Sequence, residues 1–190
     1  MENFDVIVVG AGPCGIYLCY ELVEKNPSLK VLLLDKGKDI YHRTCPILEG
    51  KTKQCPQDIF GKSECYPSCS MTSGFGGCGA FSDGKFNITS EFGGWMSDYL
   101  PKDEVVDLIR YVDEINLKHG APDKITDPNT KEILDIERRG LAVGLKLLRS
   151  QVRHLGTEVN LKLLQSIYEE LLAKGVSMKF NTEIKDIIVS

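Results

Sequence analysis

Three glycines near the start of the chain have the spacing of a turn that can hold phosphate groups. Gly10, Gly12 and Gly15 follow the β-branched run Val6–Val9, typical of a fully buried parallel strand, and precede an apolar stretch with helical periodicity. Gly10 would let the chain turn sharply, Gly12 would let the backbone approach a pyrophosphate, and Gly15 would let the helix pack close to the sheet. The start of that helix would direct N–H groups and the positive end of its dipole at the phosphates. The pattern therefore predicts a dinucleotide site.

An acidic residue follows at the position where such a site recognises a ribose. Residues 30–35 have the composition of a second strand, and Asp35 ends it 20 residues after Gly15. A carboxylate there can accept hydrogen bonds from a ribose 2′-hydroxyl, and it would repel the 2′-phosphate of NADP. The position near the N-terminus and the sequence Asp35-Lys36-Gly37 favour FAD over NAD. An NAD-binding dehydrogenase remains the alternative.

A second glycine-rich stretch covers residues 74–85. Its small residues leave backbone N–H groups free, as a loop that lies against a flat ring or a phosphate requires. Asp83 and Lys85 could supply charge near such a ligand. A flexible turn is the other interpretation, but phenylalanines at short intervals are not typical of a glycine-rich linker. An NAD-binding dehydrogenase would leave this stretch without a role.

Seven cysteines allow a different kind of chemistry. A Cys- and Pro-rich loop is predicted over residues 38–79, and it contains Cys45, Cys55, Cys65 and Cys69. Four thiolates could bind zinc or an iron–sulfur cluster, but the spacing lacks the paired Cys-x-x-Cys units of such sites. Free thiols are therefore favoured, and a metal- or cluster-binding module is a second alternative. Cys78 has no second cysteine a few residues later, which argues against a redox-active dithiol. Cys14 and Cys19 fit core positions of the first helix.

The composition is that of an ordinary globular protein. Of the 190 residues, 42% are hydrophobic and 26% are charged, and the formal net charge is −4. This balance gives no reason to expect nucleic acid or an anionic membrane as a partner. The acidic residues at positions 2 and 5 do not suit a secretion signal, and no apolar run approaches the ~20 residues of a membrane span. We therefore expect a cytoplasmic location.

The hydrophobic patterns predict alternating helices and strands. Helices are expected over residues 13–26, 102–119, 136–152 and 158–174, and strands over 176–180 and 184–189 in addition to the two described above. Asp103 and Glu104 suit the first turn of the helix over 102–119, and Thr157 suits the N-cap of the one over 158–174. The expected fold is α/β and Rossmann-like with a parallel central sheet, incomplete at the C-terminus, with a helical insertion over 100–155.

Several longer motifs give the sequence a family resemblance. They are Gly10-Ala11-Gly12-Pro13-x-Gly15, the stretch Gly76-Gly77-x-Gly79-Ala80-Phe81-Ser82-Asp83-Gly84-Lys85, Tyr111-Val112-Asp113 with His119-Gly120-Ala121-Pro122, and Arg153-His154-Leu155-Gly156-Thr157-Glu158. With these motifs the chain resembles the flavoproteins with two dinucleotide-binding domains, the type of glutathione reductase. More closely, it is similar to the N-terminal part of an uncharacterised family of FAD-dependent dehydrogenases. Members of that family are more than twice as long as this chain.

The resemblance implies an FAD-dependent oxidoreductase that transfers hydride through flavin N5, with an unknown substrate and an unknown electron-transfer partner. It implies a cofactor site made of Gly10, Gly12, Pro13, Cys14, Gly15, Asp35, Lys36, Arg43, Gly76, Gly77, Gly79, Ala80 and Ile184. Lys85 or Arg43 could stabilise negative charge near flavin N1. No catalytic base is assigned; Asp83, His42 and His154 are candidates, each with a structural or surface role as the simpler interpretation. By itself the 190-residue chain is expected to be inactive, and to bind FAD more weakly than the complete protein or not at all.

Overall fold

The computed structural model describes residues 2–55, 65 and 68–189. The chain divides into two compact units, one formed by Met1–Ser82 and Asn160–Ser190 and the other by Asp83–Val159. We call the first the sheet unit and the second the ribbon unit. None of the helices in the described part of the chain is long and apolar enough to cross a membrane.

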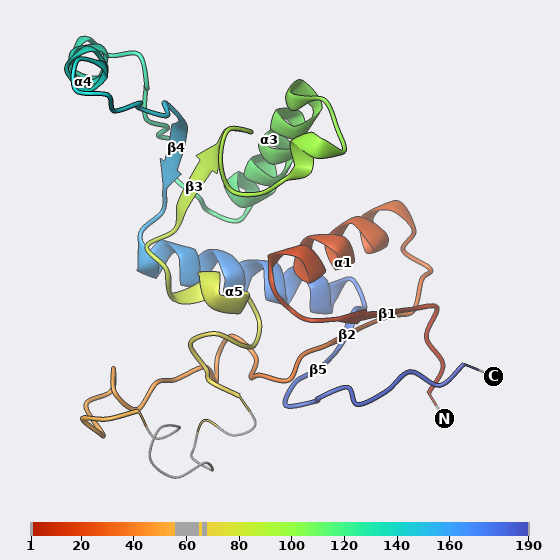
Figure 1. The fold of residues 1–190 in the computed structure, drawn as a ribbon. Helices are drawn as coiled ribbons and strands as arrows, with labels where there is room; N and C mark the ends of the chain where they lie inside the picture. Colours follow the sequence, from red (N-terminus) through yellow and green to blue (C-terminus); the bar gives the residue numbers. More distant parts are fainter. Residues whose placement is uncertain (1, 56–64, 66–67, 190) are drawn as a thin grey trace. The chain divides into compact units, whose positions relative to one another are not determined.

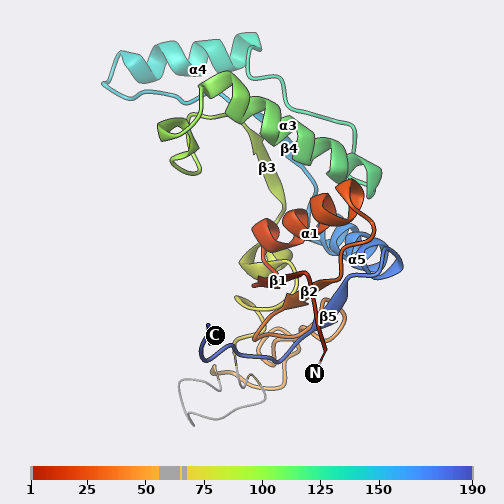
Figure 2. The same ribbon diagram turned by 90° about the vertical axis from the view of Figure 1, so that its right-hand side faces the viewer.

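The sheet unit contains a parallel sheet with a helix in each crossover. Its elements are β1 (Val6–Val9), α1 (Pro13–Lys25), β2 (Val31–Leu34), the 3₁₀ turn η1 (Gly77–Phe81), most of α5 (Thr157–Ala173) and β5 (Ser177–Lys179). Within the described residues the three strands are ordered β1-β2-β5, with Val6 opposite Val31 and Leu32 opposite Ser177. Figures 1 and 2 show α1 and α5 on the same side of this sheet. The expected α/β class with a parallel sheet is confirmed.

The position of each strand explains its burial. All four residues of β2 are buried, because it is the central strand and has a neighbour on both sides. The expectation of a fully buried first strand is wrong, because β1 has one partner strand among the described residues. Only Val8 of β1 is buried, while Ile7 and Val9 are 55% and 61% exposed.

The helices of the sheet unit follow their apolar stripes. Ile16, Cys19 and Val23 of α1 are buried, and the helix ends where the Asn26 N–H bonds the Leu22 carbonyl. Leu163, Ile167 and Leu171 are the buried residues of α5, which corresponds to the helix predicted over 158–174 and begins one residue earlier, at Thr157. The stripes place one face of each helix in the core.

The ribbon unit is built on a pair of antiparallel strands. Its elements are β3 (Lys85–Ile88), the 3₁₀ turn η2 (Met96–Asp98), α3 (Lys102–Lys118), α4 (Lys131–Leu141) and β4 (Gln151–His154), and Lys85 pairs with His154. The predicted helix over 102–119 corresponds to α3, with His119 at its C-cap.

Two other predictions of secondary structure are wrong. The helix expected over 136–152 is α4 followed by β4. Gly144, which has a φ of +79°, and the bond from the Leu145 N–H to the Gly140 carbonyl interrupt the helical path, and β4 is held by its distant partner β3. Residues 184–189 form no strand, although the structure describes all of them.

A buried ion pair joins three of the motifs that carry the family resemblance. Arg153 of β4 donates to both carboxylate oxygens of Asp113 in α3, at 2.7 Å each, and to the carbonyl oxygen of Pro122. Both charged side chains are buried. Hydrogen bonding to Asp113 raises the pKa of Arg153 above its ordinary value. These motifs therefore hold the ribbon unit together.

Candidate functional site

The fold itself requires two of the three glycines in the first turn. Gly10 has a φ of +102°, in the region that favours glycine, and its N–H bonds the Leu34 carbonyl at 2.7 Å. A Cβ on Gly15 would lie 2.0 Å from the Gly10 carbonyl oxygen and 3.3 Å from Val8 Cγ1. The first turn of α1 therefore packs directly on the end of β1, as the spacing predicts.

Gly12 differs from its neighbours because nothing in the described protein requires a glycine there. Its φ of −75° and ψ of 179° suit any residue, and a Cβ would have no described atom within 4 Å. It is the N-cap of α1, and within the described residues no side chain caps this helix; its first turn carries no acid. Pro13 and Cys14 are exposed beside it, so the expectation of a core position for Cys14 is wrong. Within the described residues, the start of α1 thus offers N–H groups and a positive dipole end with no capping side chain and no acid in the first turn.

This start of α1 opens on a hollow along β1. Its volume is about 470 Å³, and its wall consists of Val6, Ile7, Val8, Val9, Gly10, Gly12, Cys14, Gly15 and Leu18. The wall therefore combines the apolar strand with the glycine turn.

Asp35 lies beside the same turn. Its Oδ2 accepts the Ala11 N–H at 2.8 Å and its Oδ1 accepts the Gly37 N–H at 2.7 Å. The residue is half-buried. A carboxylate has about four acceptor sites, so each oxygen can still accept a hydrogen bond from a ligand hydroxyl. The structure thus brings the predicted ribose acid and the predicted phosphate turn together.

The second glycine-rich stretch packs on the first turn. The Gly76 N–H bonds the Ala11 carbonyl at 2.8 Å, and a Cβ on Gly77 would lie 3.3 Å from Gly12 Cα. Phe75 anchors the stretch in the core, because it is fully buried and its ring meets that of Tyr168 edge-on at 5.1 Å. The two glycine motifs therefore form one continuous backbone surface.

Asn160 of α5 orients η1, a role that the sequence did not reveal. Its Nδ2 donates to the carbonyls of Gly79 and Ala80, at 2.8 and 3.2 Å. These carbonyls therefore point toward α5, while a Cβ on Gly79 would meet no described atom within 4 Å. Asn160 is an ordinary polar residue in a helix, and no local pattern marks it.

Arg43 is a buried residue whose side chain holds two loop segments by hydrogen bonds. The side chain is 4% exposed; its Nε donates to the Ser70 carbonyl at 2.8 Å and its Nη1 to the Phe75 carbonyl at 2.6 Å. Burial lowers the pKa of Arg43 below its ordinary value, and the negative charge of Asp35 opposes that shift. Arg43 therefore fixes the loop that leads into the second glycine stretch.

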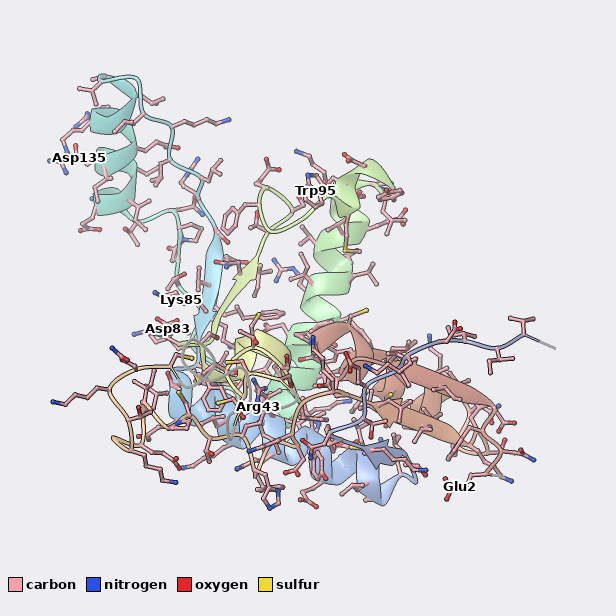
Figure 3. The ribbon with its side chains drawn as sticks, turned by 60° about the horizontal axis from the view of Figure 1, so that its bottom comes forward. Glu2, Arg43, Asp83, Lys85, Trp95 and Asp135 are labelled. Carbon is pink, nitrogen blue, oxygen red and sulfur yellow. The ribbon has the colours of Figure 1, made fainter. Side chains whose placement is uncertain are left out.

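The other predicted site residues lie in varied places. Lys36 is exposed next to Asp35, and Ile184 is 38% exposed in the segment that follows β5. His42 is exposed and bonds Asp39 through Nδ1. In the ribbon unit, Asp83 Oδ2 lies 3.0 Å from Lys85 Nζ and 3.6 Å from His154 Nε2 (Figure 3).

The structure describes all seven cysteines, and none of them forms a disulfide bond. Among the residues that the structure describes, no group of three or more His, Cys, Asp or Glu side chains is arranged to hold a metal ion. Cys65 is buried, and Cys45, Cys55 and Cys69 are partly exposed. Cys19 is in the core as predicted, and burial raises its pKa to about 11.

The chain is an α/β protein whose sheet unit carries a glycine-lined turn beside an acid. No family model matches its sequence, and a search of curated proteins finds no match either. Among solved structures, it is similar to an L-amino acid deaminase from Proteus vulgaris, with 16% identity and a TM-score of 0.44 over 95% of this chain and 40% of that one. It is also similar to a 3-ketosteroid-delta4-(5alpha)-dehydrogenase from Rhodococcus jostii RHA1, with 12% identity and a TM-score of 0.48 over 94% of this chain and 38% of that one. The chain thus spans about two fifths of the length of these structures.

Proposed function

We propose that the sheet unit binds FAD in a Rossmann-like fold of the glutathione-reductase type, and that the chain is the FAD-binding portion of an FAD-dependent oxidoreductase. The observation that carries this proposal is Gly12, a glycine that the described fold does not require, at a helix N-terminus that has no capping side chain and no acid in its first turn among the described residues. A glycine that the protein does not need is explained by a ligand that needs the space. A pyrophosphate suits this position, because it brings negative charge and approaches the backbone closely.

The remaining parts of the dinucleotide have matching groups around the same turn. Asp35 can accept hydrogen bonds from the adenosine ribose beside the phosphates. The backbone of η1, oriented by Asn160, can lie along the flavin ring. The backbone near Ile184 is proposed to hold the adenine. When bound, the flavin would supply hydride transfer at its N5.

The second glycine stretch supports FAD over NAD. It forms one backbone surface with the phosphate turn through the bond from Gly76 to Ala11. A nicotinamide dinucleotide would use the first turn and leave this surface without a function.

Titration of the chain with FAD, NAD⁺ and ADP tests the proposal. We expect FAD to bind more tightly than NAD⁺, and the variant Asp35→Ala to weaken binding of both FAD and ADP. The variant Asp5→Ala is a matched control, because Asp5 bonds the Lys30 N–H at the opposite end of the strands. Tighter binding of NAD⁺ than of FAD would favour the NAD-binding dehydrogenase instead.

A further inference from the structure

Two buried polar atoms beneath the second glycine stretch have no hydrogen-bond partner within the described structure. They are Nη2 of Arg43 and Oγ of Ser70. The two residues adjoin, because Arg43 Nε donates to the Ser70 carbonyl, and they are 4% and 2% exposed. Leaving such groups unsatisfied destabilises the folded protein, and a charged donor more than a neutral one. A ligand group that bonds both atoms would recover the lost stability.

The charge of Arg43 indicates what kind of ligand group would bond these two atoms. Within the described residues Arg43 forms no ion pair; the charge of Asp35 acts on it from beyond ion-pair distance, and its guanidinium carbon is 5.0 Å from the centre of the Phe81 ring. A buried cation without a close counter-ion is costly, by several kcal/mol even after relaxation. A buried water molecule would satisfy the two hydrogen bonds but would not neutralise the charge. An anion would do both.

We propose that Arg43 Nη2 and Ser70 Oγ form a subsite for an oxyanion next to the loop that carries Gly74 and Phe75, whose Phe75 carbonyl accepts a bond from Arg43 Nη1. The guanidinium group donates one charge-assisted bond, and the hydroxyl donates a second. A phosphate oxygen has the required chemistry. It can belong to the bound dinucleotide, in which case the subsite rests on the proposed function, or to a separate phosphate ion.

Ser70→Ala tests the subsite without disturbing the hydrogen bonds of Arg43. The backbone carbonyl that accepts the Arg43 Nε–H is retained, and only the unpartnered hydroxyl is removed. We expect the melting temperature of the ligand-free protein to stay the same or rise, because a buried unsatisfied hydroxyl is lost. Affinity for the oxyanion should fall about tenfold or more, since a hydrogen bond to a charged group is removed. Ser68→Ala is the control, because Ser68 is on the same loop and its hydroxyl bonds the Lys36 carbonyl.

Melting temperatures are measured with sodium phosphate, with sodium chloride at equal ionic strength, and with FAD. Loss of the phosphate-induced shift in Ser70→Ala alone supports a separate anion, and loss of the FAD-induced shift supports the phosphate of the dinucleotide. The inference is overturned if neither compound stabilises the natural chain, or if Ser70→Ala responds to both as Ser68→Ala does. Gly12→Ala separates the two proposals, because it should weaken FAD binding and leave the phosphate-induced shift unchanged if the anion is separate.

Discussion

Replacing Gly12 and Gly15 by alanine should give opposite results, although the two residues lie in the same turn. In Gly15→Ala the added Cβ would be 2.0 Å from the Gly10 carbonyl oxygen, so the backbone must move. Overpacking of this kind costs about 1–3 kcal/mol. At about 2–4 °C per kcal/mol for a chain of this size, the melting temperature should fall by about 2–12 °C.

In Gly12→Ala the added Cβ meets no described atom, and the backbone angles suit alanine. Loss of a glycine N-cap costs about 0.5–1 kcal/mol. Reduced freedom of the unfolded chain returns about 0.4–1 kcal/mol. The two effects nearly cancel, so the melting temperature of the ligand-free protein should change by about 2 °C or less.

For FAD affinity the order is reversed: Gly12→Ala should be the more damaging of the two substitutions. The Gly12→Ala methyl group would occupy the space that the pyrophosphate needs, and we expect affinity to fall at least about tenfold, which corresponds to about 1.4 kcal/mol. Differential scanning fluorimetry gives the melting temperatures, and titration followed by flavin fluorescence gives the affinities. Unchanged FAD affinity in Gly12→Ala would refute the argument from the open space. If Gly12→Ala lost as much stability as Gly15→Ala, the premise that the described protein leaves space around Gly12 would be refuted.

Three further outcomes follow from contacts elsewhere in the chain. Arg153→Met leaves the buried Asp113 without its partner, so the free energy of unfolding of the ribbon unit should fall by about 3–5 kcal/mol. Amide exchange in β3 and β4 that stays as slow as in the unsubstituted chain would contradict this. Because burial raises the pKa of Cys19 to about 11, its thiol stays protonated at pH 8 and becomes a thiolate only as the pH nears that value. Iodoacetamide should therefore label the exposed Cys14 and Cys78 before Cys19, and mass spectrometry showing Cys19 labelled first in the folded protein would disprove it. Asn160→Ala removes one donor that bonds two carbonyls of η1, so amides there should exchange faster and FAD should bind less tightly, whereas unchanged exchange would show that η1 is held without it.

The sequence predicted the part of the fold that is specified locally. From β1 through the glycine turn and α1 to Asp35, every feature depends on spacing within about one βαβ unit, where periodicity and glycine positions are decisive. Helices α3 and α5 were also predicted, because each has an apolar stripe and a recognisable start. The expected close packing at Gly15 is present in the structure.

Features that depend on residues far away in the sequence could not be predicted from local sequence patterns. Strand β4 lies in a stretch with helical periodicity, and its conformation comes from pairing with β3, far away in the sequence. The charge of Arg43 suggested a ligand contact, but two of its three nitrogen atoms donate to carbonyls of a later loop. Asn160 had no signal at all, because its function depends on which carbonyls lie opposite it.

The most direct test of the dinucleotide site is an NMR titration of the ¹⁵N-labelled chain with FAD, a method that also detects weak binding. We predict that the amide signals of Gly12, Cys14 and Gly15 shift most, together with that of Ala11, whose N–H bonds the Asp35 carboxylate. Amides at the opposite end of the strands, such as that of Lys30, should stay in place. If FAD binds and these turn signals do not move, or if only signals of the ribbon unit move, the proposed cofactor site is wrong.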